Sequence, residues 1–420
     1  MWMFSLRARV LACLLMLAGS ATAQQQATRT ETPATPAALT KEVKDEVLAA
    51  LAEVVTQRAF VPGVDLAKWP EFLEKQREAL DKAERDTDFS RAVNAALRDF
   101  GISHIRFNAP RVAENRRRTS VIGVGVTARP DNGALRVTYV YKDAPADKAG
   151  IKVGELISLI DGKAPEGAAA LLGDEGSEVK LTVKGQDEKE REVVLKRAAH
   201  STARADTLTW VGEDAAILKI HSFQRGYRMD AIDQLMGEAA KAKFLIVDLR
   251  SNGGGSTANL QHLLSHFLPA NSVIGTFINR QLAQEFEKLN GRAESDPLVL
   301  AKAATRNYRT RALPQGQFKG KVAVLINRGS ASASEICASA LREHLAATVV
   351  GSRTAGAVLA SVFRSLPHGY ELQYPVSDYV SFKGVRLEKN PVVPDIEVTE
   401  PVADGKDPVV EAALSKLRSQ

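Results

Sequence analysis

Apolar residues follow a helical period in the first quarter of the chain. From Val43 to Val55 they recur three or four positions apart, which is the spacing of one buried helix face. Tracts of the same kind run from about residue 69 to 83 and from 89 to 100, where Gly101 ends the third. The pattern therefore predicts a helical region over residues 41–115, with a short extended piece at 102–105.

Residues 116–200 show short alternating runs instead. Strands are expected at 121–127, 135–140, 156–161, 179–183 and 191–196. Asp131-Asn132-Gly133 supplies the turn between the first two, since Asn and Gly accept the left-handed backbone of tight hairpins. This part of the chain is predicted to be a separate β-domain.

From residue 205 to 400, buried strands alternate with helices. Strands are expected at 216–221, 244–249, 322–326 and 348–350, and helices at 228–242, 259–267 and 332–344. Alternation of this kind indicates an α/β domain whose helices cover a largely buried sheet. The fold class is therefore a multidomain α/β protein, with a C-terminal tail or helix at 401–420.

The N-terminus carries the pattern of a cleaved export signal. Arg7 and Arg9 precede an apolar stretch over 10–18, and Ala21-Thr22-Ala23 is a small-residue cleavage site. We expect a signal peptide at 1–23, a flexible polar leader at 24–40, and no membrane span after signal removal. The protein is accordingly expected to be periplasmic or secreted.

Composition limits the remaining classes of partner. The chain of 420 residues is 45% hydrophobic and 25% charged, with a net charge of +6 at pH 7, which calls for no nucleic-acid partner. Cys13 lies in the signal, so the mature chain would keep only Cys337 and form no internal disulfide. Cys337 is expected to be a small buried thiol.

The segment 321–335, KVAVLINRGSASASE, predicts a strand, a tight turn of small residues and a helix. A serine at such a turn exposes its hydroxyl, while the helix N-terminus offers free backbone N–H groups to an anion. Acyl transfer needs that pairing of nucleophile and oxyanion donors. The segment alone leaves open the alternative of serines that merely cap an ordinary helix.

The segment 244–255, FLIVDLRSNGGG, predicts a buried strand that ends in a charged pair and three glycines. Glycine allows a backbone to approach a ligand closely and to point N–H groups at it. A phosphate-binding loop is disfavoured because the Gly-Lys-Ser/Thr ending is missing. No H-E-x-x-H or clustered ligand spacing occurs, so no metal and no cofactor are expected.

The β-domain resembles a PDZ domain over about 80 residues. The resemblance rests on the sequence of residues 144–162, APADKAGIKVGELISLIDG. It implies that Val121, Ile122, Gly123 and Val124 form a carboxylate-binding loop, beside which an extended peptide would add to the sheet edge. An inert or regulatory β-domain is the alternative.

Together, DLRSNGGG and NRGSASASE resemble the C-terminal processing proteases, also called tail-specific proteases. The resemblance implies that Ser332 is the nucleophile. It implies that the N–H groups of Ala333 and of the pair Gly254 and Gly255 form the oxyanion hole. The positions that shape the site in this family fall on Arg250, Glu335 and Thr354.

The chain departs from the usual family pattern at the general base. Ala357 stands where the family lysine would be, and alanine cannot accept a proton. The branch exemplified by the tricorn core protease uses a histidine from a Ser-His pair, which Ser103 and His104 match. Glu388 matches the glutamate of that branch, although its spacer Lys389-Asn390-Pro391 differs from the usual small one.

These features predict an exported serine endopeptidase that acts near the C-termini of unfolded or tagged proteins. Polypeptides, held by their C-termini, are its expected partners, and the oligomeric state, homo-oligomer included, stays open. The alternative is a catalytically silent scaffold that has the same fold and binds chain termini through its PDZ domain. The missing lysine motivates this second hypothesis.

Overall fold

The computed structural model describes residues 39–117, 120–185, 187–224, 226–399 and 406–419. The expected signal peptide, and the expected leader up to residue 38, lie outside this part of the chain. No helix within the described ranges is long and apolar enough to cross a bilayer.

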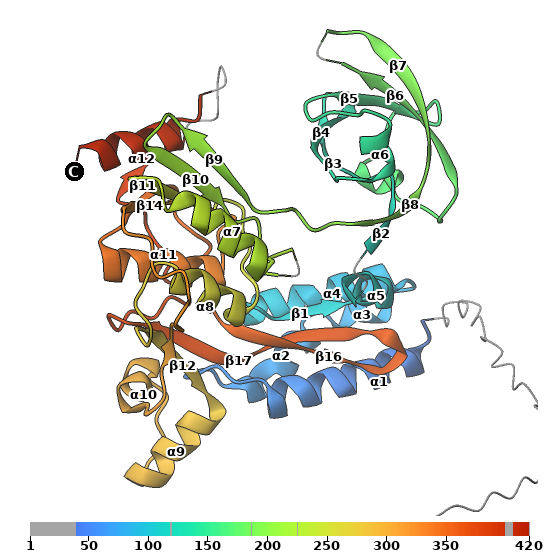
Figure 1. The fold of residues 1–420 in the computed structure, drawn as a ribbon. Helices are drawn as coiled ribbons and strands as arrows, with labels where there is room; N and C mark the ends of the chain where they lie inside the picture. The colour runs from blue at the N-terminus through green and yellow to red at the C-terminus, as the bar shows by residue number, and fades with distance from the viewer. Residues whose placement is uncertain (1–38, 118–119, 186, 225, 400–405, 420) are drawn as a thin grey trace, which may run out of the picture. The chain divides into compact units, whose positions relative to one another are not determined.

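The N-terminal region consists of α1 (Lys41–Glu53), α2 (Trp69–Glu74), α3 (Arg77–Asp81) and α4 (Asp86–Phe100), joined by a π turn (Val54–Arg58) and a 3₁₀ turn (Leu66–Lys68) (Figure 1). The predicted second helix is thus two short ones. α4 ends at Gly101, whose φ of 76° is the left-handed conformation that glycine favours at a helix C-terminus.

The helical region shares its core with a strand from the far end of the chain. Trp69, Phe89 and Phe107 are buried together with Tyr370 and Leu372. Phe107 belongs to β1 (Arg106–Asn108), which pairs antiparallel with β17 (Glu371–Ser381), and α5 (Pro110–Arg117) follows β1. The expected extended piece at 102–105 is wrong: these residues form a turn, in which His104 has φ 55°.

The β-domain has its own core and a five-stranded antiparallel sheet. The sheet order is β3-β4-β5-β6-β7, while β2 forms a separate two-stranded sheet with β8. The strand predicted at 121–127 is broken, because Gly125 turns the chain with φ 85°. The elements are β2 (Ser120–Gly123), β3 (Val126–Asp131), β4 (Ala134–Val140), α6 (Pro145–Lys148), β5 (Leu156–Ile160), a 3₁₀ turn (Ala168–Leu171), β6 (Glu178–Lys184), β7 (Glu190–Lys196) and β8 (Ala198–Ser201).

The α/β domain is built on a six-stranded sheet of order β18-β15-β14-β11-β10-β9, parallel except for β9. Its strands are β9 (Thr207–Val211), β10 (Ala215–Lys219), β11 (Phe244–Asp248), β14 (Lys321–Ile326), β15 (Thr348–Gly351) and β18 (Ile396–Glu397). Its helices are α7 (Met229–Ala239), α8 (Thr257–Ser265), α11 (Ala333–Leu345) and α12 (Pro408–Arg418).

Both faces of this sheet are covered, which explains why its central strands β11 and β14 are almost entirely apolar and buried. In β14, Val322, Val324 and Ile326 join the core that contains α7, α8 and α11. The alternate residues Ala323 and Leu325 join the core that contains α12. Parallel strands also bring the carboxyl ends of β11 and β14 to one edge, where the two sequence motifs begin.

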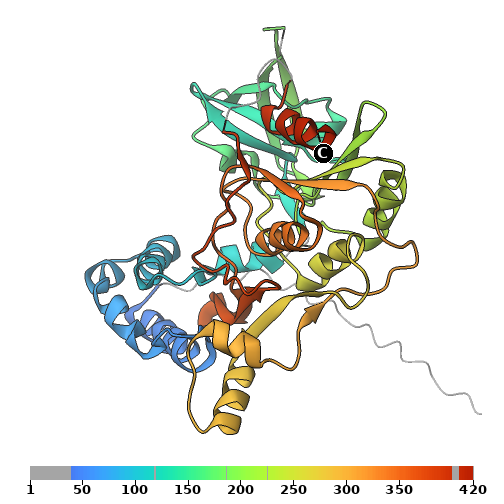
Figure 2. The ribbon, with the colours of Figure 1, turned by 90° about the vertical axis from the view of Figure 1, so that its left-hand side faces the viewer.

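A second sheet was not predicted. β17 lies at its centre between β1 and β12 (Val273–Asn279), with β13 (Tyr308–Arg309) beside β12 and β16 (Ala360–Ser365) also on β17. A 3₁₀ turn (Pro367–Gly369) joins β16 to β17. The helices α9 (Arg280–Asn290) and α10 (Pro297–Ala303) form a pair beside β12 (Figure 2), where Phe286 and Leu300 pack on Ile278 and Val380.

Candidate active site

Ser332 lies in a tight turn between β14 and α11. Its φ and ψ of 58° and −119° are unfavourable for a residue with a Cβ, so the surrounding turn must hold it there. One such restraint is Ser330, whose hydroxyl donates to the Leu249 carbonyl at 2.8 Å and accepts from Asn327 N at 3.0 Å. Ser332 stays partly exposed while the residues after it are buried.

The backbone N–H of Ser332 is shared between two acceptors. It lies 2.9 Å from the Ala357 carbonyl and 3.0 Å from Glu335 Oε2. The fully buried Glu335 carboxylate also accepts from Thr354 Oγ1 at 2.6 Å, Gly356 N at 2.8 Å and Ala357 N at 3.0 Å. Glu335 and Thr354 therefore lie beside the turn, as the motif positions imply.

Burial raises the pKa of Glu335, and the four donors around it act in the opposite direction. A carboxylate held by so many donors is a rigid clamp. It fixes the segment 354–357 against the start of α11 and thereby fixes the backbone at Ser332.

Ser103, His104 and Glu388 form a hydrogen-bonded chain, although 285 positions separate the serine from the glutamate. Ser103 Oγ donates to Glu388 Oε2 at 2.9 Å and lies 3.0 Å from His104 Nδ1. The Ser103 hydroxyl has one proton, which it donates to the carboxylate. Its oxygen must therefore accept the hydrogen bond from the protonated Nδ1 of the ring. This chain selects the His104 tautomer that leaves Nε2 as a proton acceptor.

This hydrogen-bonded chain is connected to the nucleophile turn through two neighbouring residues. Glu388 Oε2 accepts from Val358 N at 2.9 Å, while the Ala357 carbonyl accepts from Ser332 N. Among the described residues, no hydrogen bond joins the His104 ring directly to Ser332. The structure thus brings Ser103, His104 and Glu388 together and links them to Ser332 through 357–358.

Burial lowers the pKa of His104 from 6.5 to about 4. The ring is therefore neutral at neutral pH, which is the form that can take up a proton. Its positive φ of 55° shows that this turn, like that of Ser332, holds a residue in an uncommon conformation.

The glycine loop after β11 packs on Ser332. A Cβ added to Gly254, which has φ 91°, would lie 2.7 Å from Ser332 Cβ and 2.9 Å from Ala333 N. The Gly254 N–H itself donates to Asn252 Oδ1 at 2.9 Å, so it is already engaged. Gly255 N and Ala333 N donate to no partner within the described ranges.

Asn252 is a site residue that the sequence analysis missed. It is fully buried, and its carbonyl accepts from Ala331 N at 3.1 Å and from Ser334 Oγ at 2.8 Å. Its side chain bonds Gly254 N and the Ile220 carbonyl. Asn252 therefore joins the glycine loop to the nucleophile turn, and its place in front of the glycines was the available signal.

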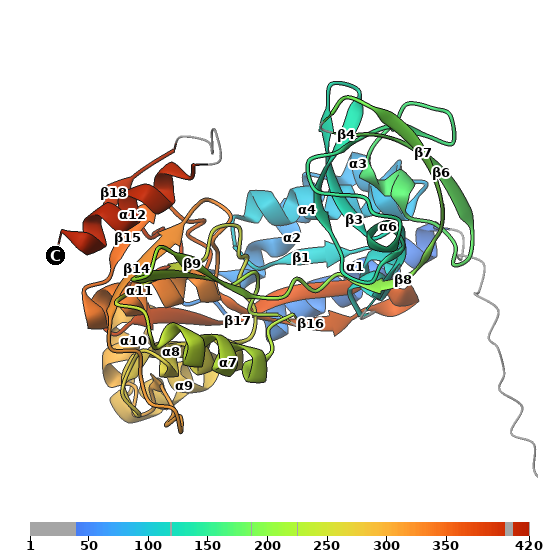
Figure 3. The same cartoon turned by 45° about the horizontal axis from the view of Figure 1, so that its top comes forward.

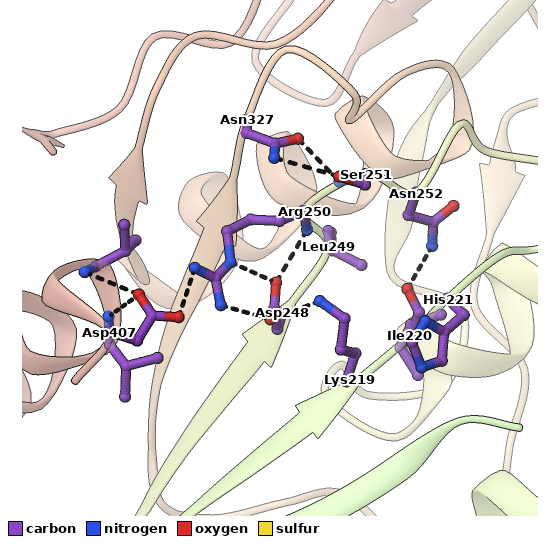
Figure 4. A network of polar contacts seen from close by, with 12 residues as sticks. Lys219, Ile220, His221, Asp248, Leu249, Arg250, Ser251, Asn252, Asn327 and Asp407 are labelled. Atoms are coloured by element: carbon purple, nitrogen blue, oxygen red, sulfur yellow. Dashed lines mark hydrogen bonds and ion pairs between the residues drawn. The ribbon is translucent and has the colours of Figure 1, made fainter. Parts of the chain in front are cut away.

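Arg250 acts elsewhere than at Ser332. Its guanidinium pairs with Asp248 at 2.8 Å and with Asp407 at 2.7 Å, and Lys219 reaches Asp248 from β10 at 2.8 Å (Figure 4). Burial would lower the pKa of Arg250, but the two carboxylates outweigh it and the pKa is raised. Arg250 supports the end of β11 and the start of α12, and so reaches the site only through the backbone.

The expected carboxylate-binding loop is occupied by its own domain. Val121, Ile122 and Gly123 pair with β8, opposite residues 198–200. Val124 N donates to the Leu171 carbonyl at 3.2 Å, and Gly123 faces Leu172 in a β-bridge. Antiparallel pairing with one neighbour uses only alternate N–H groups of a strand, so part of the loop is engaged and a peptide carboxylate that needs the Val124 N–H would have to displace the Leu171 carbonyl.

The comparisons with known proteins agree with this architecture. Residues 214–398 match the model of Peptidase family S41, and residues 136–185 match a PDZ domain. A probable CtpA-like serine protease of Staphylococcus haemolyticus is 26% identical over 289 residues, covering 67% of this chain and 53% of that protein. The tail-specific protease of Haemophilus influenzae is 26% identical over 376 residues, covering 81% and 50%.

The chain spans about half the length of these curated relatives. Among solved structures, a photosystem II D1 C-terminal processing protease superposes with a TM-score of 0.50 at 22% identity, covering 90% of this chain and 98% of that one. At this identity the likeness concerns the fold.

Proposed function

We propose that the chain, which belongs to the C-terminal processing protease family within peptidase family S41, is a serine endopeptidase that cleaves near the C-termini of unfolded or tagged proteins. The observation that carries the proposal is the chain from Glu388 through Ser103 to His104, anchored beside Ser332. A histidine that acts as a general base requires hydrogen bonds of this kind, which fix its tautomer and orient its ring.

In the proposed reaction, the Ser332 hydroxyl attacks the scissile carbonyl and His104 Nε2 accepts its proton. Ser103 keeps Nδ1 protonated, and the Glu388 carboxylate stabilises the imidazolium through Ser103. His104 then returns the proton to the leaving amine, and a water repeats the sequence on the acyl-enzyme. The contact between Nε2 and the serine is expected to tighten when substrate binds.

The oxyanion hole is assigned to the N–H groups of Ala333 and Gly255. Both are without a hydrogen-bond partner among the described residues, and Ala333 adds the positive end of the α11 dipole. Gly254 has a different part: it lets the loop touch Ser332, because a side chain there would collide with the nucleophile.

Loss of the family lysine fits this scheme. The Ala357 backbone binds Ser332 N and Glu335, so the segment is retained as a support while its side chain carries no chemistry. We assign the chain to the tricorn-core-like branch on the strength of Ser103, His104 and Glu388.

Recruitment and location complete the proposal. The pattern at 1–23 supports export to the periplasm or beyond. The PDZ domain would capture an unfolded C-terminus when the carboxylate displaces the Leu171 carbonyl from Val124 N, which couples peptide binding to opening of this loop.

The test is digestion of an unfolded protein substrate by the wild type and by Ser332→Ala. The wild type should release fragments and Ser332→Ala should not, while both keep the same thermal unfolding midpoint. A chelator should not abolish the reaction, because no step uses a metal. Equal digestion by the two proteins would exclude Ser332 as nucleophile.

A second candidate is a silent scaffold with the same fold. The observations that favour it are Ala357 in place of lysine and the missing direct bond between His104 and Ser332. It predicts binding of peptide C-termini with no turnover by the wild type, so the same experiment separates the two candidates.

A further inference from the structure

A cluster outside the serine site combines two histidines and an aspartate. His262 and His266 lie four positions apart at the C-terminal end of α8, and Asp233 reaches them from α7. The two helices lie side by side (Figures 1 and 3). One donor atom of each residue lies within 4.8 Å of the others, although Asp233 is about 30 positions away in the chain.

Hydrogen bonding alone leaves this cluster unsatisfied. Asp233 Oδ1 lies 3.1 Å from His262 Nε2 and 3.0 Å from His266 Nε2, and it also accepts from Gln315 at 2.6 Å. One carboxylate oxygen has two lone pairs, so three donors exceed its capacity. His266 is 1% exposed, and its Nε2 makes no aligned hydrogen bond despite the short distance.

We propose that Asp233, His262 and His266 form a binding site for a divalent transition metal ion, best matched by Zn²⁺. Two imidazole nitrogens and one carboxylate oxygen are ligands that zinc prefers, with one position left for water. With bonds of about 2.1 Å, neighbouring ligand atoms of a tetrahedral site lie about 3.4 Å apart. The present separations of 3.0 and 3.1 Å come within a few tenths of an ångström of that value.

The surroundings fit such a site. Tyr227 Oη lies 2.8 Å from His262 Nδ1 and can fix the ring with Nε2 turned to the ion, as outer partners of metal-binding histidines do. The half-exposed Asp233 and the exposed Gln315 leave one side open for entry of an ion.

The ion would join α7 to the end of α8, the helix that begins directly after the glycine loop. Tyr227 stacks on Phe223, and Phe223 N bonds the Gly254 carbonyl at 3.0 Å. The expectation of no metal rested on the missing zinc-protease spacing, whereas His262 and His266 form a different i, i+4 pair in HLLSH at 262–266.

The experiment is calorimetric titration of chelator-treated, full-length protein with ZnCl₂, repeated with MgCl₂. Wild type should bind one Zn²⁺ per chain and no Mg²⁺, and Zn²⁺ should raise its unfolding midpoint. Asp233→Asn and His262→Gln should each weaken zinc binding about tenfold or more. The matched control is His368→Gln, which removes a surface histidine paired with Glu46 and should bind like the wild type.

Asp233→Asn should fold like the wild type, because the Asp233 side chain is 41% exposed and Asn keeps an oxygen that can accept from Gln315. Its unfolding midpoint without metal should equal that of the wild type. Co²⁺ should give the visible spectrum of a tetrahedral site in the wild type and in His368→Gln, but not in Asp233→Asn or His262→Gln. No zinc binding by the wild type, or equal affinity in all four proteins, would overturn the proposal.

Discussion

Replacing Glu388 tests the proposed base directly, because its two replacements separate hydrogen bonding from charge. Ser103 Oγ and Val358 N both bond the same oxygen, Oε2, at 2.9 Å. Glu388→Gln can place its single amide oxygen there and keep both bonds, losing only the charge. Glu388→Ala removes both.

The magnitudes follow from the two bonds. An unsatisfied buried donor costs about 1–3 kcal/mol, and each 1.4 kcal/mol is about tenfold in rate. In Glu388→Ala, Ser103 can turn its proton toward His104 Nδ1 and select the wrong tautomer. We therefore expect kcat to fall about 10- to 100-fold or more in Glu388→Ala, and less than about tenfold in Glu388→Gln, with KM nearly unchanged in both.

The assay is steady-state cleavage of a fluorogenic peptide, with thermal unfolding measured on each protein. Glu343→Gln is the matched control, because that carboxylate bonds Ser339 and Ser381 outside the chain of bonds to His104. It should retain wild-type kcat. A Glu388→Ala protein with wild-type kcat would refute the reasoning.

Five further outcomes are expected. Activity should fall on acidification with a midpoint near pH 4, not 6.5, because burial lowers the pKa of His104; a kcat/KM profile measures it, and a midpoint at 6.5 would contradict it. Because the unfolded chain binds a proton at His104 more readily than the folded chain, the free energy of unfolding should decrease as the pH falls from about 6.5 toward 4. Above about pH 6.5 the contribution of neutral His104 to the free energy of unfolding is fully present. Gly254→Ala should reduce kcat by about 10²–10³-fold because its Cβ would meet Ser332, whereas Gly253→Ala, with nothing within 4 Å, should be neutral. Asp407→Ala should destabilise the protein to urea by about 1–2 kcal/mol through loss of the α12 cap and the bond to Arg250, and Asp407→Asn should recover most of the cap term. Peptides with a free C-terminus should be cleaved faster than amidated ones if 121–124 captures the carboxylate; equal rates at low and moderate salt would leave the PDZ domain as a gate.

The sequence predicted the fold best where one period dominated. The buried parallel strands β11 and β14 lie within one residue of their predicted ranges, and the amphipathic helix α4 ends where predicted but begins three residues earlier. The thiol of Cys337 is buried and free, as expected. The central strand β17, ELQYPVSDYVS, was missed because it contains a proline and buries two acids: Glu371, which pairs with the distant Arg116, and Asp378, which pairs with Arg386.

The candidate site was predictable only as far as local motifs reach. Ser332 and the glycines carry their geometry in neighbouring residues, so the turn and the loop follow from the sequence. The contact between Ser103 and Glu388 depends on tertiary packing of the helical region against β17, which no local pattern encodes. Engagement of Gly254 N by Asn252 and of Val124 N by Leu171 likewise appears only in three dimensions.

Covalent labelling with a fluorophosphonate probe tests the central claim most directly, since it reads nucleophile activation without any assumption about substrate. At pH 7 the wild type should be labelled on Ser332, as located by peptide mass spectrometry, and Ser332→Ala should not react. His104→Ala should react about 10²–10⁴-fold more slowly while keeping the wild-type unfolding midpoint. Labelling of folded His104→Ala at the wild-type rate, or no labelling of the wild type, would contradict a serine nucleophile activated by His104.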